Sequence, residues 1–300
     1  MNSYDSLIKA LTLIEDGKSE TLTIQRLAGE AYLSESHLLR LFKLTTGQSL
    51  MDYVRGRKLA HSLKELYGSG LNVAGVALNC GFQHEQSYIR AFRSEYNCTP
   101  GKARKNKMIL PIRERVELEY LKAVDRGFIY GPEIVMLPAV HLVGKPHEFR
   151  PFDYEKQGLE PNRIGLRFFV ETYGQIPNVI FPQIYYAVTA ALPGGIEVGI
   201  EYMPCLQVKD LSQVPKGYTG RTFPAMQCAR FRYIGDHSVD EISMVTAREI
   251  YNARYNFFIN QSRYRQHGSI RHFERIDLSH YDGEYCVLEL MPPVIDTYKN

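Results

Sequence analysis

The stretch LSESHLLRLFK, residues 33–43, decides how the first third of this chain folds. Ser34 is a preferred helix N-cap residue, because its hydroxyl accepts a hydrogen bond from a backbone N–H of the first turn. Leu38 and Leu41 then recur at a spacing that places them on one face of a helix. Gly47, a residue type that commonly ends helices, follows. The pattern predicts an amphipathic helix between Ser34 and Gly47.

The end of this stretch is repeated fifty residues later. Residues 40–43 read RLFK, and residues 90–93 read RAFR. Upstream, residues 27–28 (Leu-Ala) match residues 76–77 (Val-Ala), and the turn that follows is one residue longer in the second copy. Two copies of a short helix, a turn and a longer helix make a tandem helix-turn-helix. A generic helical repeat is the alternative, although such arrays normally need at least three units to bury their faces.

Charge divides the chain in the same place. The net charge of +3 combines residues 1–107, with 15 Lys and Arg against 10 Asp and Glu, and residues 108–300, with 21 against 23. The first part is therefore at +5 and the second at −2. Of the 35 Tyr and Phe, 26 lie after residue 107. A basic first third suggests a module that binds a polyanion, although +5 also fits an ordinary solvated surface.

The second helix of a helix-turn-helix unit presents polar side chains to base edges in the major groove. The outward positions of these two helices are the candidates for contact with double-stranded DNA: Ser36, Leu39 and Arg40, then Glu85, Gln86, Ser87 and Arg90. Arginine bonds guanine and glutamine bonds adenine bidentately, whereas Leu39 offers only apolar contact, such as with a thymine methyl. For Arg40 and Arg90, a phosphate contact or an ion pair within the domain is equally open. Glu85 fits an acid at a helix start better than a cytosine contact.

From Glu133 onward the periodicity is that of strands. The β-rich runs are 134–143, 179–188, 196–208, 225–233, 272–276 and 285–290. Helices are predicted at about 164–173 and 239–257. Because few strand–helix–strand units follow one another, we expect an α+β domain with mainly antiparallel sheet.

Between the two parts, residues 108–132 are predicted to form a linker that is partly helical, over 112–126. The fold class is therefore multi-domain: an all-α tandem helix-turn-helix domain at 1–107, the linker, and an α+β domain at 133–300. The basic run at 102–107 either contacts phosphate or is simply solvated.

The first domain resembles AraC/XylS-type transcription regulators. The resemblance rests on residues 33–43 with Gly47 and residues 53–57, and on residues 76–77, 81–82, 88–93 and 99–101 in the second unit. It covers about residues 5–106, with both units and the connecting helix in the same order and spacing. It implies seven helices, with two recognition helices reading successive major-groove faces along one side of the DNA.

The second domain resembles GyrI-like effector-binding domains. The resemblance rests on residues 220–235, with Phe223-Pro224-Ala225 and Gly235, on residues 272–276, and on residues 289–294. A helix-turn-helix domain followed by a GyrI-like domain is the layout of the Rob-like subgroup. The resemblance implies a concave α+β fold that binds a small amphipathic molecule, often a cation.

Such a pocket would combine aromatic faces, which attract cations, with a poorly solvated carboxylate. Glu274 is the first choice, because it lies in an alternating run beside the apolar residues Phe273 and Ile276. Glu289 and Glu201 are the alternatives. The alternative for Glu274 is a surface carboxylate paired with a neighbouring arginine, Arg271 or Arg275. The adjacent aromatic pairs at 168–169, 185–186 and 257–258 are expected in the core, and there is no Trp to stack a ligand.

Several classes of protein are disfavoured. No apolar run reaches the eighteen residues of a membrane span. No signal peptide is expected, and the five scattered cysteines read as reduced thiols in a cytoplasm. No metal-ligand spacing, phosphate loop or nucleophile elbow is found, so we expect neither cofactor, metal nor catalytic residues. The resemblance to AraC/XylS-type regulators implies a transcription activator that contacts RNA polymerase, and these exclusions place it in the cytoplasm as an expectation. The alternatives are a second domain that only contacts a protein partner, and a GyrI-like hydrolase.

Overall fold

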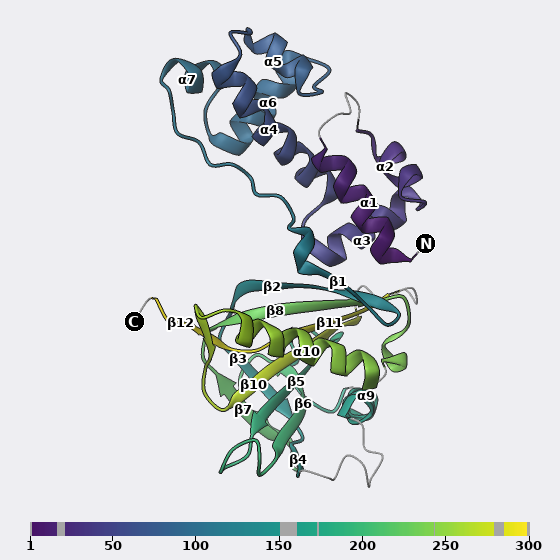
Figure 1. Ribbon diagram of the computed structural model, residues 1–300. Helices are drawn as coiled ribbons and strands as arrows, with labels where there is room; N and C mark the ends of the chain where they lie inside the picture. The colour runs from purple at the N-terminus through teal and green to yellow at the C-terminus, as the bar shows by residue number, and fades with distance from the viewer. Residues whose placement is uncertain are drawn as a thin grey trace. The chain divides into compact units, whose positions relative to one another are not determined.

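The computed structural model describes residues 2–16, 22–150, 161–172, 174–242, 244–278 and 285–298. The chain divides into two compact units, Met1–Glu119 and Tyr120–Asn300. The first is helical, and the second is built on an antiparallel sheet (Figure 1). The predicted fold class is confirmed.

The described residues of the first unit form seven helices, as the family resemblance implies. They are α1 (Ser3–Glu15), α2 (Ile24–Glu30), α3 (Glu35–Thr46), α4 (Leu50–Gly68), α5 (Val73–Asn79), α6 (Glu85–Tyr96) and α7 (Pro100–Lys105). Every helix except α6 begins at a side chain that accepts a hydrogen bond from the first turn: Asn2, Thr23, Ser34, Ser49, Asn72 and Thr99. These short polar residues therefore set where the helices start.

The two helix-turn-helix units share one turn geometry. The backbone N–H groups of Leu33 and Phe82 each donate to the carbonyl oxygen of the alanine five residues earlier, at 2.9 Å in both copies. The residue before each has a left-handed backbone, with φ 56° at Tyr32 and 71° at Gly81. The repeat predicted from the sequence is thus a repeat in structure.

The long helix α4 packs against helices of both helix-turn-helix units. It contacts α1 and α3 on the side of the first, and α5, α6 and α7 on the side of the second. Phe42 of α3 meets Tyr53 of α4 with ring centroids 5.3 Å apart. In the second helix-turn-helix unit, Tyr88 and Phe92 of α6 are fully buried, with ring centroids 5.6 Å apart. Each recognition helix is therefore anchored by aromatic side chains on its inner face.

The predicted helix over 112–126 is wrong. Residues 108–117 have no regular secondary structure, and η1 (Leu118–Tyr120) is one 3-10 turn. Strands β1 (Leu121–Val124) and β2 (Gly127–Leu137) follow as a hairpin whose turn includes Arg126 at φ 54°. The apolar spacing that suggested a helix belongs to segments with different partners. The compact units divide within the predicted linker; the domain limits at 107 and 133 stay predictions.

The second unit contains a sheet in the order β1-β2-β8-β11-β10-β5-β6-β3-β7, with β4 also paired to β6. Its remaining strands are β3 (Val140–Gly144), β4 (His147–Phe149), β5 (Ile184–Ala191), β6 (Ile200–Val208), β7 (Thr219–Phe223), β8 (Met226–Gly235), β10 (Ile270–Asp277) and β11 (Cys286–Met291). A separate pair is formed by β9 (Tyr264–Gln266) and β12 (Val294–Asp296). The helical elements are α9 (Pro161–Thr172), η2 (Val239–Glu241) and α10 (Met244–Asn260). All the sheet pairs are antiparallel, as predicted.

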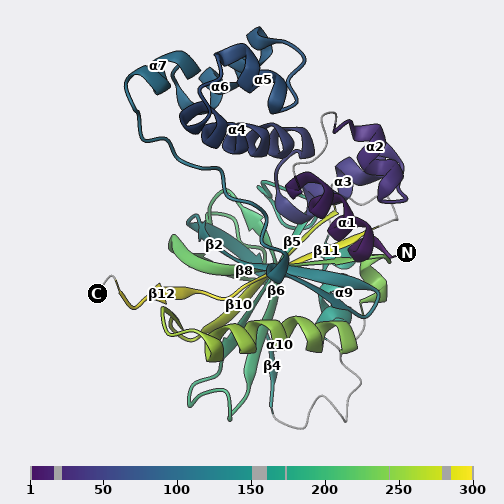
Figure 2. The ribbon, with the colours of Figure 1, turned by 45° about the horizontal axis from the view of Figure 1, so that its top comes forward.

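The two faces of this sheet bury different cores. On one face, Phe168 of α9 and Ile250 of α10 pack with strand residues such as Phe231. On the other, Phe223 of β7 and Phe273 of β10 lie with ring centroids 5.2 Å apart, although three strands separate β7 from β10 in the sheet order. Neighbouring strands are about 4.8 Å apart, so a flat sheet would keep these rings far apart. The sheet therefore curls strongly over this face, and Figure 2 shows its strands fanning in different directions.

Candidate nucleic-acid interface and acidic cavity

The outer faces of α3 and α6 carry the residues predicted to contact DNA. Ser36, Glu85, Gln86 and Arg90 are exposed, and Leu39, Arg40 and Ser87 are half-buried. None of the seven belongs to the buried core of the unit. The structure thus places the predicted residues on two corresponding surfaces, three on α3 and four on α6.

Two further basic residues extend these surfaces. Lys43 and Arg93 are exposed in the last turns of α3 and α6, three positions after Arg40 and Arg90. Side chains three apart share a helix face, so each recognition helix carries a basic pair. The repeated motifs RLFK and RAFR already contained this signal, because both begin and end with a basic residue.

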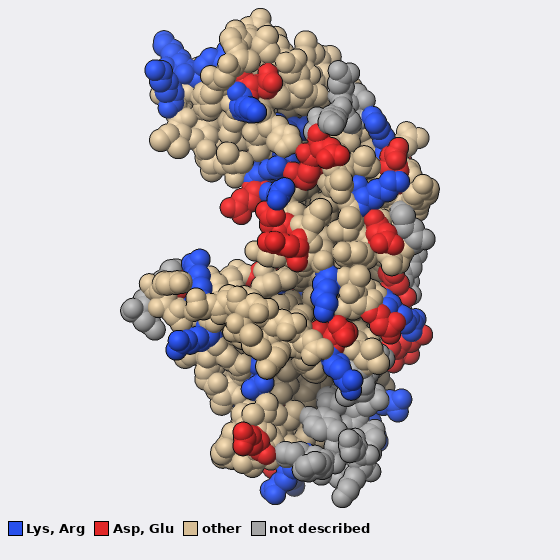
Figure 3. Space-filling view, in the orientation of Figure 1, with Lys and Arg blue, Asp and Glu red and all other residues tan. Residues whose placement is uncertain are grey.

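The basic run after α6 splits into two roles. Arg104 donates to the carbonyl oxygens of Leu66 at 2.7 Å and Leu71 at 2.6 Å, so it holds α7 against the end of α4. Lys102 and Lys105 are exposed. Figure 3 shows Lys and Arg gathered at the end of the unit that carries α7. This end can attract phosphate, whereas Arg104 is structural.

Glu274 lies in the middle of β10 with only 4% of its surface exposed. The Tyr251 hydroxyl of α10 donates to its Oε1 at 3.1 Å, and His272 Nε2 lies 3.3 Å from the same oxygen. The two contacts described for this carboxylate therefore both involve Oε1. The alternative of a surface carboxylate paired with Arg271 or Arg275 is wrong, because Glu274 is buried and its described contacts are with Tyr251 and His272. The Arg275 guanidinium bonds Glu289 and Asp277 instead.

Glu274 helps to line a small cavity on the helix-covered face. The other lining residues are Leu166, Tyr185, Tyr202, Val239, Ile242, Ile276 and Leu288. The Tyr185 and Tyr202 hydroxyl oxygens lie 2.8 Å apart. The centre of a water molecule can occupy about 10 Å³ of the cavity, which is room for roughly one water. The cavity is thus acidic and aromatic, and closed to anything larger in this conformation.

The two tyrosine hydroxyls and the imidazole beside Glu274 are uncharged at pH 7. Burial raises the pKa of the Tyr185 and Tyr202 hydroxyls well above the ordinary value, and the charge of Glu274 adds to the effect. Burial also lowers the pKa of His272, so its ring is neutral at pH 7. A neutral His272 that donates to Glu274 carries its proton on Nε2. Its Nδ1 then remains a buried acceptor that has no hydrogen-bond partner among the described residues.

Helix α9 closes one side of the cavity through a glycine. A Cβ at Gly165 would collide with the Tyr185 hydroxyl oxygen and lie 2.9 Å from that of Tyr202. Only glycine lets the α9 backbone approach the tyrosine pair this closely. The position of α9 therefore sets how tightly the cavity is closed.

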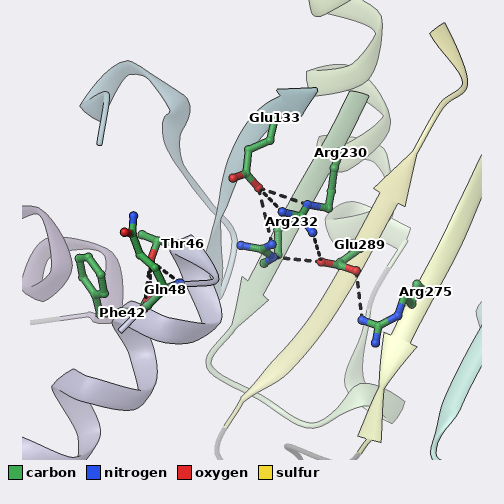
Figure 4. Close-up of polar contacts among 8 residues, drawn as sticks. All are labelled: Phe42, Thr46, Gln48, Glu133, Arg230, Arg232, Arg275 and Glu289. Atoms are coloured by element: carbon green, nitrogen blue, oxygen red, sulfur yellow. Dashed lines mark hydrogen bonds and ion pairs between the residues drawn. The ribbon is translucent and has the colours of Figure 1, made fainter. Parts of the chain in front are cut away.

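The two alternative carboxylates lie elsewhere and are both paired with arginine. Glu289 is opposite Arg275 in the sheet, on the face away from Glu274, because neighbouring strand residues point to opposite faces. It accepts bonds from Arg232 at 3.2 Å and Arg275 at 3.1 Å (Figure 4). Glu201 accepts two bonds from Arg221. The structure thus leaves Glu274 as the predicted carboxylate that faces a cavity.

Sequence reasoning missed most of the partners of Glu274. Tyr185 lies in the core, as expected, and its lining of the cavity is what the sequence did not indicate. Tyr202 follows the predicted Glu201, so the cavity uses the neighbouring position on the opposite face of β6. His272 shares a strand face with Glu274 in the predicted run 272–276, so the alternation could have indicated it, whereas Tyr251 carried no signal because α10 had to be placed on β10 first.

Comparison with known proteins matches the helical unit. The model of a helix-turn-helix domain family matches residues 27–106. The probable transcription factor PqrA of Proteus vulgaris is 34% identical over 89 residues, 30% of this chain and 73% of PqrA. The multiple antibiotic resistance protein MarA of Escherichia coli is 32% identical over 98 residues, 33% of this chain and 77% of MarA. The chain belongs to the AraC-type family of transcription regulators.

Other proteins match this AraC-type regulator over a smaller part of their own length or with lower sequence identity. The transcriptional regulator Rob of Salmonella typhimurium is 30% identical over 96 residues, which are 32% of this chain and 33% of Rob. The DNA-binding domain of AdpA, solved with a target DNA, is 24% identical with a TM-score of 0.33, covering 34% of this chain and 92% of that one. The integron cassette protein VCH_CASS2 of Vibrio cholerae is 10% identical with a TM-score of 0.40, covering 56% of this chain and 99% of that one.

Further observations bear on the classes of protein weighed from the sequence. Among the described residues of the regulator, no group of three or more His, Cys, Asp or Glu is arranged to hold a metal ion. In that same part of the chain, no helix is long and apolar enough to cross a membrane. All five cysteines are free thiols, and four of them are buried.

Proposed function

We propose that this AraC-type regulator is a sequence-specific transcription activator that reads DNA with α3 and α6. The observation that supports this is the duplicated outer surface: each recognition helix presents a basic pair, Arg40 with Lys43 and Arg90 with Arg93, beside smaller polar side chains. Phosphates are contacted by the exposed lysines near α7. Gln86 and the arginines are placed to read base edges.

We also propose that the second unit senses a small amphipathic cation, with Glu274 as its counter-charge. Support comes from the burial of Glu274, from both described contacts ending on Oε1, and from the tyrosine pair in the same cavity. A carboxylate that is shielded from water attracts a cation more strongly than a solvated one. The cavity admits about one water, so ligand entry requires movement of α9 or α10.

The remaining parts of the proposal concern partners and chemistry. An activator works by contact with RNA polymerase in the cytoplasm, and we assign this role to the chain. We also take the second unit to be a binding module and not an enzyme. The acidic aromatic cavity favours ligand sensing over a domain that only contacts a protein or one that hydrolyses a substrate.

Two experiments with the full-length protein test the proposal. Selection from a random duplex library should yield a sequence that the protein binds at least 1000-fold more tightly than random duplex. Calorimetry with dodecyltrimethylammonium should then show saturable binding that Glu274→Gln weakens and that Glu197→Gln, the same change at an exposed position, does not. Binding of every duplex with one affinity would end the DNA part of the proposal. Equal cation binding by all three proteins would end the sensing part.

A further inference from the structure

The segment after α7 turns back and follows α4 through the helical unit. We call residues 108–117 the strap. The carbonyl oxygen of Met108 accepts from the Tyr67 hydroxyl at 2.7 Å, near the end of α4. Eight residues later the backbone N–H of Val116 donates to the Tyr53 hydroxyl at 3.0 Å, near the start of α4. The strap therefore runs antiparallel to α4 over fourteen helical residues, about 21 Å at 1.5 Å per residue.

The strap bonds to both helix-turn-helix units. Its Arg113 guanidinium forms two hydrogen bonds with the Glu95 carboxylate of α6, at 2.9 and 3.0 Å. At the other end, the Tyr53 hydroxyl that receives Val116 donates to Glu15, the last residue of α1. The strap thus connects α6, in the second helix-turn-helix unit, to α1, which precedes the first.

The first half of α4 has room for the strap at Gly56. A Cβ at Gly56 would collide with Arg113 Cδ and Nε. Glycine inside a helix is destabilising relative to alanine, because it loses more conformational freedom on folding. Here the glycine gives Arg113 the room to cross the helix. Arg57, next to it, donates to the Arg113 carbonyl oxygen and bonds Glu15 at 2.7 Å.

We propose that the strap sets the angle between the two recognition helices, with Arg113 as the positioning residue. The inference rests on the proposed reading of DNA by both α3 and α6. Helix α4 is the element that packs against both units, and the strap braces it along most of its length. Without this brace, α4 alone, with a glycine inside it, holds the two helix-turn-helix units together. The spacing of the two DNA half-sites that the regulator accepts then becomes less strict.

The test uses the full-length protein, the duplex obtained by selection, and a duplex with one base pair inserted between its half-sites. One base pair rotates the half-sites by about 35° relative to each other. The wild-type protein should bind the inserted duplex at least tenfold less tightly than the selected one. Arg113→Ala should reduce this ratio to below threefold. The matched control is Arg115→Ala, which removes the same charge from an exposed strap position paired with Glu117.

A second variant disturbs the strap from the side of α4 and leaves Arg113 itself unchanged. Gly56→Ala improves the intrinsic helix propensity of α4 but displaces Arg113. It should therefore lose the spacing discrimination as Arg113→Ala does, although no interaction with DNA has been removed. Thermal melting of each variant identifies any that unfolds.

A readout without DNA separates this inference from the proposed function. Spin labels at Gln25→Cys in α2 and Ser94→Cys in α6, with Cys80→Ser, report the distance between the units. Arg113→Ala and Gly56→Ala should each broaden the distance distribution, and Arg115→Ala should leave it narrow. Wild-type distributions in both test variants would overturn the inference even if DNA binding is confirmed. If the selection yields no preferred duplex but the distance distributions broaden in the two test variants, the DNA-reading proposal is wrong and the inference about the strap holds.

Discussion

The replacement Glu274→Gln should separate charge recognition from shape in the proposed sensing site. Glutamine keeps the size of the side chain and an acceptor for the Tyr251 hydroxyl, which lies 3.1 Å from Oε1. It removes the negative charge. Folding should survive, because an acid that is 4% exposed and has no Lys or Arg within ion-pair distance among the described residues costs desolvation free energy in the native protein.

The magnitude follows from the burial of the carboxylate. Two unit charges 4 Å apart attract by about 4 kcal/mol at an effective dielectric constant of 20. Desolvation of the cation offsets part of this, and hydrogen bonds to charged groups are worth about 1.5–3 kcal/mol net. We therefore expect Glu274→Gln to weaken cation binding by about 2 kcal/mol, roughly 30-fold.

The assay is titration calorimetry with dodecyltrimethylammonium and with dodecanol, which has the same chain and no charge. The cation should lose roughly 30-fold in affinity, and the alcohol less than threefold. Glu197→Gln serves as the control for a change in net charge at an exposed position. A loss of equal size for both ligands would mean that Glu274 shapes the cavity and does not recognise charge.

Three further predictions concern the DNA surface and the buried histidine. Arg40→Ala and Gln86→Ala should each weaken binding of the selected duplex by about 1–3 kcal/mol in fluorescence anisotropy, with little change on random duplex; equal losses on both would reassign them to phosphate. The unit 1–119 alone should bind DNA with an affinity that falls by about 0.9 log units per phosphate contact for each tenfold rise in salt; an affinity independent of salt would contradict this. His272 has a lowered pKa because of burial, so the unfolded chain binds the extra proton first and stability falls as pH drops below about 6.5. His272→Gln should flatten that fall in thermal melts from pH 7 to pH 5, and an unchanged slope would assign it to other groups.

The helical unit could be predicted well from sequence because its signals are local. Caps such as Ser34, stops such as Gly47 and the repeated motif at 40–43 and 90–93 act within one or two turns of chain. The outer face of each recognition helix follows directly from this periodicity. The seven predicted contact residues are therefore all at the surface or half-buried there.

The strap and the cavity could not be predicted in the same way. The apolar residues between 112 and 126 fit a helical spacing, but Val116 is buried beside α4 while Leu121 pairs with Tyr130 in a hairpin. Membership of the cavity depends on the register of β5, β6 and β10, where a shift of one residue changes the face. Glu274 was found because its own flanking residues alternate. Its tyrosine partners come from strands and a helix far away in sequence.

The most direct test of the central claim is a hydroxyl-radical footprint of the full-length protein on the selected duplex. Two recognition helices of one protein, each in a major groove, should protect two patches on the same side of the DNA, about one helical turn or 10 base pairs apart. Arg40→Ala should weaken one patch and Arg90→Ala the other. A single protected patch, or two patches that both fade with either variant alone, would contradict the account of one chain that reads DNA at two separate sites.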